Sequence, residues 1–116
     1  LLSSSNVLIL GFTFKENCPD IRNTKVYDLI KKLEEYNLNL EIVDPWVNPE
    51  EAKKVYELNI NKKISKSVKF NAVVCIVAHK EFTNMNKSDW ENILDQKGFI
   101  FDLKGIVPRE LSPIRI

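Results

Sequence analysis

Short apolar segments alternate with amphipathic segments along this chain, and this alternation restricts the fold more than any other feature. The apolar segments are residues 7–10, 40–43, 72–78 and 99–101. Uninterrupted apolar runs such as the first and third are typical of strands that are covered on both faces. Strands that alternate with helices form a parallel sheet with right-handed crossovers. We therefore expect an α/β fold, a three-layer Rossmann-like sandwich in which helices cover both faces of a parallel sheet.

The segment that follows the first strand has the spacing of an amphipathic helix. Its apolar residues, within 26–33, recur at i, i+3, i+4 and i+7, and Lys and Glu occupy the other face. Asn23 is expected to cap the start of this helix, and Asn37 is expected to close its end in a left-handed conformation.

Two further helices are predicted from their capping residues. Asn48 is a suitable N-cap, and Pro49 follows it at the first helical position. Ser88 begins a capping-box sequence, and Gly98 supplies a C-terminal stop. Residues 59–70 lack periodicity, so we expect an irregular connection there with at most a short strand.

Size and composition indicate one globular domain. A chain of 116 residues can bury one sheet with its helices but not two separate cores. Its apolar runs are far shorter than the roughly 20 residues that span a bilayer, so no membrane insertion is expected. A net charge of +1, with Lys interleaved among Glu and Asp, argues against nucleic acid as a partner.

The ends and the cysteines indicate the context of the chain. It begins without Met and without the pattern of a signal peptide, so we expect a piece of a longer protein. Cys75 lies in an apolar run and Cys18 in a loop, which does not make a disulfide framework. A reduced, cytoplasmic protein is expected.

The loop after the first strand, residues 11–23, is the best candidate for a ligand site. Ligands of open α/β sheets bind outside the carboxyl ends of the strands. Gly11 allows the backbone to turn or to approach a ligand closely, and Lys15 and Arg22 place two cations on the same loop. This combination suits an anionic ligand.

The same loop reads Gly-Phe-Thr-Phe-Lys-Glu-Asn-Cys-Pro-Asp-Ile-Arg-Asn. Further landmarks are Val-Asp-Pro at 43–45, Ala-His-Lys-Glu-Phe at 78–82 and Phe-Asp-Leu-Lys-Gly at 101–105. In this order they closely resemble the C-terminal, UDP-binding domain of the UDP-glucose/GDP-mannose dehydrogenase family. The resemblance spans nearly the whole chain, and each landmark falls at a predicted carboxyl end of a strand.

The resemblance implies which residues bind the substrate. Phe14 would pack against the nucleotide or sugar, and Lys15 would contact the sugar or phosphate side. Lys104 stands where many relatives carry an arginine that binds the diphosphate; it keeps the charge but loses the bidentate fork. In the alternative interpretation, Phe14 belongs to the core and both lysines are merely solvated. The predicted substrate-binding residues are Gly11, Phe14, Lys15, Arg22 and Lys104.

Other polar residues at this edge favour structural roles. Asp20 and Arg22 can order the loop as an ion pair, although direct contact with the ligand stays open. Asp44 stands where a dinucleotide-binding fold places its ribose-binding acid, but the Gly-x-Gly-x-x-Gly fingerprint is missing, so we expect Asp44 to order the Asp-Pro turn. His79, the only histidine, lacks a catalytic partner at a telling spacing and is expected to be a polar loop residue near the cleft. No metal-ligand cluster and no catalytic residue is predicted.

The resemblance also implies a parent enzyme. Members of the family oxidise the C6 alcohol of a UDP-sugar to a uronic acid with NAD, through a cysteine that lies upstream of this domain; Cys18 does not match that motif. NAD and the catalytic cysteine would then belong to missing domains, and a missing central helix would form a homodimer. The sequence of the opening loop resembles that of family members that act on UDP-N-acetylhexosamines in the synthesis of surface polysaccharides. The single domain, residues 1–116, is expected to bind a UDP-sugar and to be inactive alone.

Two other functions stay open at this point. The chain could be a stand-alone nucleotide-binding regulatory module without an enzymatic parent. It could also be a scaffold that holds the rest of a cleft without touching the ligand.

Overall fold

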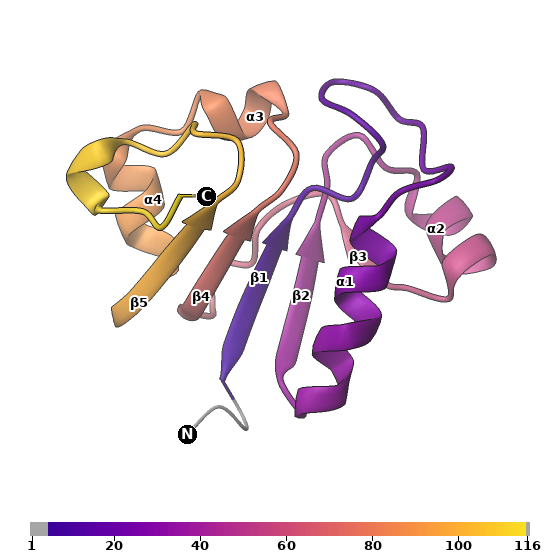
Figure 1. The fold of residues 1–116 in the computed structure, drawn as a ribbon, viewed down its shortest axis with the longest axis horizontal. Coiled ribbons are helices and arrows are strands. Elements are labelled where there is room, and N and C mark those ends of the chain that lie inside the picture. Colours follow the sequence, from indigo (N-terminus) through magenta and orange to yellow (C-terminus); the bar gives the residue numbers. More distant parts are fainter. Residues whose placement is uncertain (1–4, 116) are drawn as a thin grey trace.

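The computed structural model describes residues 5–115 and contains a five-stranded parallel sheet in the order β3-β2-β1-β4-β5 (Figure 1). The strands are β1 (Asn6–Leu10), β2 (Asn39–Val43), β3 (Ile60–Asn61), β4 (Phe70–Cys75) and β5 (Leu94–Asp102). The helices are α1 (Val26–Leu33), α2 (Pro49–Tyr56), α3 (Lys80–Thr83) and α4 (Lys87–Ile93), with 3₁₀ turns at Glu34–Tyr36 and Arg109–Leu111. The predicted α/β class is confirmed.

Alternate side chains of the central strand β1 enter two separate cores. Val7 and Ile9 pack with residues of α1 and α2 on one face of the sheet. Leu8 and Leu10 pack on the other face, with Phe82 of α3, Trp90 of α4 and their neighbours. Because side chains of a strand alternate between faces, β1 is buried on both sides. The helices therefore form outer layers on both faces, as predicted.

The predicted cap of α2 is confirmed, whereas α1 spans the predicted residues 26–33 without the predicted cap. Asn48 accepts hydrogen bonds from the backbone N–H groups of Glu50 and Glu51, at 3.0 and 3.3 Å, and Pro49 follows it. The backbone of Asn23 is instead left-handed, with φ 57°, and the hydroxyl of Thr24 accepts the Val26 N–H at 3.2 Å. Asn23 is thus a turn residue before α1, not its N-cap.

The second half of the chain corrects three predicted boundaries. β4 ends at Cys75 rather than at residue 78. α4 is capped by Asn86, which forms a reciprocal capping box with Asp89, so the predicted cap at Ser88 is wrong. Gly98 does not stop this helix but lies within β5, where the pairing of β4 with β5 shifts register. A Cβ at Gly98 would lie 2.7 Å from the carbonyl oxygen of Phe70, so only glycine fits there.

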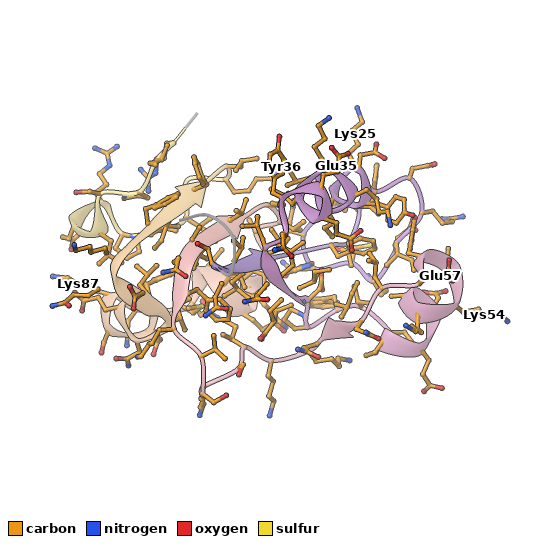
Figure 2. All side chains as sticks on the ribbon, turned by 90° about the horizontal axis from the view of Figure 1, so that it is seen from below. Lys25, Glu35, Tyr36, Lys54, Glu57 and Lys87 are labelled. Atoms are coloured by element: carbon orange, nitrogen blue, oxygen red, sulfur yellow. The ribbon has the colours of Figure 1, made fainter. Side chains whose placement is uncertain are left out.

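The loops that follow β1, β2, β4 and β5 lie at one edge of the sheet, at the top of Figure 1. Parallel pairing forces this arrangement, because the carboxyl ends of all strands point the same way. Elsewhere on the surface, Lys25, Lys54 and Lys87 project from different sides of the molecule (Figure 2). Within the described residues, no helix is long and apolar enough to cross a membrane.

Candidate functional site

A buried carboxylate joins the first two strands at this edge. Asp44 follows β2 and is fully buried. Its Oδ2 accepts the N–H groups of Phe12 at 2.7 Å and Thr13 at 3.0 Å, and its Oδ1 accepts the N–H of Trp46 at 2.8 Å. Burial alone would raise the pKa of Asp44, but hydrogen bonds from His79 and from the N–H groups of Phe12 and Thr13 hold it below its usual value. Asp44 orders the Asp-Pro turn, as expected.

These contacts also bear on NAD. Both oxygens of Asp44 are engaged by groups of the chain itself, and so the carboxylate does not face a ribose. The single Gly11 does not replace the missing glycine-rich fingerprint. Asp44 therefore does not have the place of the ribose-binding acid of a dinucleotide site.

His79 lies in the loop between β4 and α3, as expected, and its side chain is fully buried there. Its Nε2 lies 2.9 Å from Oδ2 of Asp44 and 3.0 Å from the hydroxyl of Thr13, and its Nδ1 accepts the N–H of Asn17 at 2.9 Å. The contacts with Asp44 and Thr13 join residues 35 and 66 positions apart in the chain, so the spacing of residues in the sequence could not predict them. The usable signal was its position, since His79 and Asp44 both follow the carboxyl ends of strands.

A second buried carboxylate shapes the loop after β5. Asp102 accepts the N–H groups of residues 105–107 at 2.9 to 3.1 Å and the Nε–H of Arg115 at 3.1 Å. Burial alone would raise the pKa of Asp102, but the Val107, Ile106 and Gly105 N–H groups and Arg115 lower it. Asp102 therefore orders the turn that carries Lys104.

The opening loop and the turn after β5 face each other across a cleft of about 270 Å³. Phe14 and Lys15 line one side of it and Lys104 lines another part, together with residues of the segment before α1. The side chain of Phe14 is 59% exposed, so the alternative that Phe14 belongs to the core is wrong. The structure thus brings together three of the predicted substrate-binding residues, which supply two ammonium groups and an accessible aromatic ring.

Gly11 serves the backbone of the site. Its φ is +103°, and a Cβ there would lie 2.6 Å from Cβ of Val77, a residue that lines the cleft. Any other residue would be strained at this φ and would collide with the segment after β4. Gly11 therefore permits the close approach of two loops and does not itself line the cleft.

Arg22 lies in a different hollow, beside Cys18 and Glu51. Its guanidinium binds Asp20 through two hydrogen bonds of 3.0 Å, which lower the pKa of that exposed carboxyl to about 2. The pair orders the loop, as the sequence favoured. A ligand contact by Arg22 stays a prediction.

Neither cysteine is paired in the described part of the chain. Cys18 and Cys75 are free thiols, and burial raises the pKa of Cys75 to about 12. In the part of the chain that the structure describes, no group of three or more His, Cys, Asp or Glu side chains could hold a metal ion.

Comparison with known sequences identifies the family. A sequence model described as UDP-glucose/GDP-mannose dehydrogenase family, UDP binding domain, matches residues 8–109. The chain belongs to this family. It is 41% identical to the UDP-N-acetyl-D-glucosamine 6-dehydrogenase of Salmonella typhi, over 99% of this chain and 27% of that protein. It is 43% identical to protein CapL of Staphylococcus aureus, over 91% of this chain and 24% of that protein.

Solved structures agree with this assignment. The UDP-N-acetyl-mannosamine dehydrogenase Cap5O from Staphylococcus aureus superposes with a TM-score of 0.70 at 27% identity, over 91% of this chain and 24% of that one. An NDP-N-acetyl-D-galactosaminuronic acid dehydrogenase from Methanosarcina mazei shares the fold, with a TM-score of 0.79 at 19% identity, over 95% and 22% of the two chains. The chain spans about a quarter of the length of the family members it matches.

Proposed function

We propose that this UDP-binding domain holds the nucleotide part of a UDP-sugar in the cleft between the opening loop and the turn after β5. The observation that carries the proposal is that Phe14, Lys15 and Lys104 line one cleft although they come from opposite ends of the chain. A diphosphate needs cations, and a base or sugar needs a flat apolar surface. The cleft offers both.

The two lysines would divide the anion between them. Each ammonium is a compact charge on a flexible stem, so it neutralises a phosphate without imposing the bidentate geometry of arginine. The exposed ring of Phe14 lies against solvent at the rim of the cleft and is free to stack on the base. In this arrangement the lysines supply affinity, and Phe14 orients the nucleotide.

The proposal extends to the protein that carries this domain. We infer an NAD-dependent oxidation of the C6 alcohol of a UDP-sugar to a carboxylate, with NAD and the catalytic cysteine supplied by other domains. The named dehydrogenases among the relatives favour a UDP-N-acetylhexosamine as substrate, used for surface polysaccharide. The proposed protein is a cytoplasmic homodimer that pairs through a helix outside residues 1–116, which form its C-terminal domain.

Titration of the ¹⁵N-labelled chain with UDP tests the binding site. We expect saturable shifts of the amide signals of residues 11–17 and 103–105, and no such shifts with uridine, which lacks the diphosphate. The variant Lys53→Met serves as a control and should show the same shifts with UDP, because Lys53 lies on α2 outside the cleft. Unchanged spectra at millimolar UDP would favour the scaffold alternative.

An activity assay tests the parent enzyme. The full-length protein, given NAD and a panel of UDP-sugars, is expected to form NADH fastest with a UDP-N-acetylhexosamine. The 116-residue chain assayed alone is expected to form none. NADH formation by the chain alone would contradict the division of labour between domains, and a gene without a dehydrogenase region would favour the regulatory module.

A further inference from the structure

One imidazole ring contacts the opening loop at two points, residues 13 and 17. Thr13, at the start of the segment that presents Phe14 and Lys15, lies 3.0 Å from Nε2 of His79. Asn17, at the end of that segment, donates its N–H to Nδ1 of the same ring at 2.9 Å. His79 lies beneath the loop and outside the residues that line the cleft, so it contacts the segment without facing a ligand there.

The neighbours of the ring determine its tautomer. The hydroxyl proton of Thr13 is donated to the carbonyl oxygen of Lys15 at 3.0 Å, and Oδ2 of Asp44 accepts hydrogen bonds. Nε2 must therefore carry the proton that bridges it to these two oxygens. Nδ1 must be unprotonated, because it accepts the N–H of Asn17. The neutral Nε2–H ring satisfies every contact.

The ring is also fixed in orientation. Trp46 stacks on it with the ring centroids 6.1 Å apart and an angle of 23° between the planes. The ring centroid of Phe82 lies 5.8 Å from that of the imidazole, and the two planes are tilted by 57°. The indole N–H of Trp46 is in turn held by Glu81 at 2.9 Å. The two aromatic rings and the hydrogen bonds at both nitrogens therefore hold the imidazole in the orientation that contacts residues 13 and 17.

We propose that His79 is a positioning residue for the UDP-sugar cleft, which sets the conformation of residues 13–17 and thereby the places of Phe14 and Lys15. The critical contact is the one from Nδ1 to Asn17. Asn17 has a left-handed backbone, with φ 55°, and its side-chain oxygen accepts the N–H of Lys80 at 2.8 Å. Without an acceptor at Nδ1, the end of the segment would keep only this second contact to the β4 side. The inference rests on the proposed function.

Two substitutions separate the two nitrogens of the ring. In His79→Gln the amide nitrogen can take the place of Nε2 and donate to Asp44, but nothing accepts the Asn17 N–H. In His79→Asn the amide oxygen can take the place of Nδ1 and accept that N–H, while Asp44 loses a donor. Thr83→Ala is the control. Thr83 is the last residue of α3, the helix that begins directly after His79, and its hydroxyl donates to the carbonyl oxygen of Lys80.

The readouts are the Kd for UDP and the hydrogen-exchange rate of the Asn17 amide, measured on folded protein. In His79→Gln we expect faster exchange at Asn17 and a Kd raised about tenfold, the effect of losing roughly one hydrogen bond. In His79→Asn, despite a lower melting temperature, we expect both values to return toward those of the unaltered chain. A glutamine variant that exchanges Asn17 rapidly and still binds UDP with the original Kd would overturn the positioning role.

Two further outcomes are distinct. If the variant with the lower melting temperature also has the higher Kd for UDP, and His79→Asn does not restore binding, His79 acts through stability alone and the inference is overturned. If neither variant folds, the ¹⁵N spectrum of the imidazole ring in the unaltered chain provides the test. A ring protonated at Nε2 and unprotonated at Nδ1 supports the inference, and the opposite tautomer overturns it. Failure of the unaltered chain to bind UDP would instead contradict the proposed function, and the positioning role for UDP would fall with it.

Discussion

Oδ2 of Asp44 lies 2.7 Å from the backbone nitrogen of Phe12, a residue 32 positions earlier in the chain. The same oxygen accepts the N–H of Thr13 and faces Nε2 of His79. The loop after β1 is therefore held by a buried carboxylate that follows β2 and a buried imidazole that follows β4. The exposed residues of the loop lie on a rigid base although the loop itself has no regular secondary structure.

The substitution Asp44→Asn tests this base. Asparagine has one acceptor oxygen in place of two, so its NH₂ group would face at least one of the buried N–H donors. A buried donor without an acceptor costs about 1–3 kcal/mol, and more when the lost partner is charged. We expect a loss of about 3 kcal/mol in the free energy of unfolding, measured by urea denaturation. Asp95→Asn, an exposed site on β5, is expected to change it by less than about 0.5 kcal/mol.

The acid limb of the stability curve should depend on the two buried carboxylates. The pKa of Asp44 and that of Asp102 are lowered in the folded protein from 3.8, so the folded state holds fewer protons than the unfolded chain in this range. Their stabilisation is complete above the unfolded pKa of about 4 and is lost as the pH falls through the folded values. Unfolding free energies should therefore fall below about pH 4. A curve of unchanged slope in Asp102→Asn would contradict this origin.

The sequence predicted those parts of the fold that depend on local pattern. The strands β1 and β2 and the start of α2 are set by apolar runs and by capping residues within a few positions. Asn23 is not the cap of α1, because Lys25 stands at the N-cap position without a side-chain cap. The hydroxyl of Thr24 accepts the Val26 N–H and donates to the carbonyl oxygen of Phe12 at 2.6 Å. The sequence predicts a helix stop at Gly98 because the role of this glycine, the close approach to Phe70, depends on strand pairing that local pattern does not show.

The candidate site divides in the same way. Phe14 and Lys15 are neighbours in one motif, so their common location required no tertiary information. Lys104 reaches the same cleft because β4 lies between β1 and β5 in the sheet and the carboxyl ends of parallel strands share an edge. The hydrogen bonds of His79 could not be predicted, since they join segments that only the folded sheet brings together.

Phe12 and Phe14 offer a matched pair that separates stability from binding. Phe12 is fully buried, and Phe14 is 59% exposed. Phe12→Ala should lower the free energy of unfolding by about 3–5 kcal/mol, the usual cost of truncating a core aromatic residue. Phe14→Ala should leave stability within about 0.5 kcal/mol, as at other exposed positions. It should weaken UDP binding by about 1–3 kcal/mol, the contribution of one stacked base. Calorimetry measures the free energy of unfolding and the affinity for UDP in each variant. Equal losses of unfolding free energy in Phe12→Ala and Phe14→Ala would contradict the structure.

The thiols should differ sharply in reactivity. Cys75 is buried with a pKa of about 12, so almost none of it is thiolate at pH 8. Cys18 is partly exposed in the opening loop. A disulfide reagent such as Ellman's is expected to label one thiol per folded chain rapidly and the second only after unfolding. Cys18→Ser should abolish the fast phase; a fast phase that survives it would place Cys75 in contact with solvent.

Lys104 tests how the cleft binds the anion. Lys104→Met keeps the length of the side chain and removes its charge, so we expect the Kd for UDP to rise about tenfold, the loss of about 1.4 kcal/mol. Lys104→Arg should retain or tighten binding, because a guanidinium can contact two phosphate oxygens at once. Binding should weaken with added salt, and less steeply in the Met variant, because one cation fewer meets the diphosphate. Lys53→Met is the matched control: Lys53 lies on α2 outside the cleft, so a Kd within about twofold of the original is expected. A larger effect of Arg22→Gln than of Lys104→Met would place the anion in the hollow beside Cys18 and Glu51 and reverse the assignment of the site.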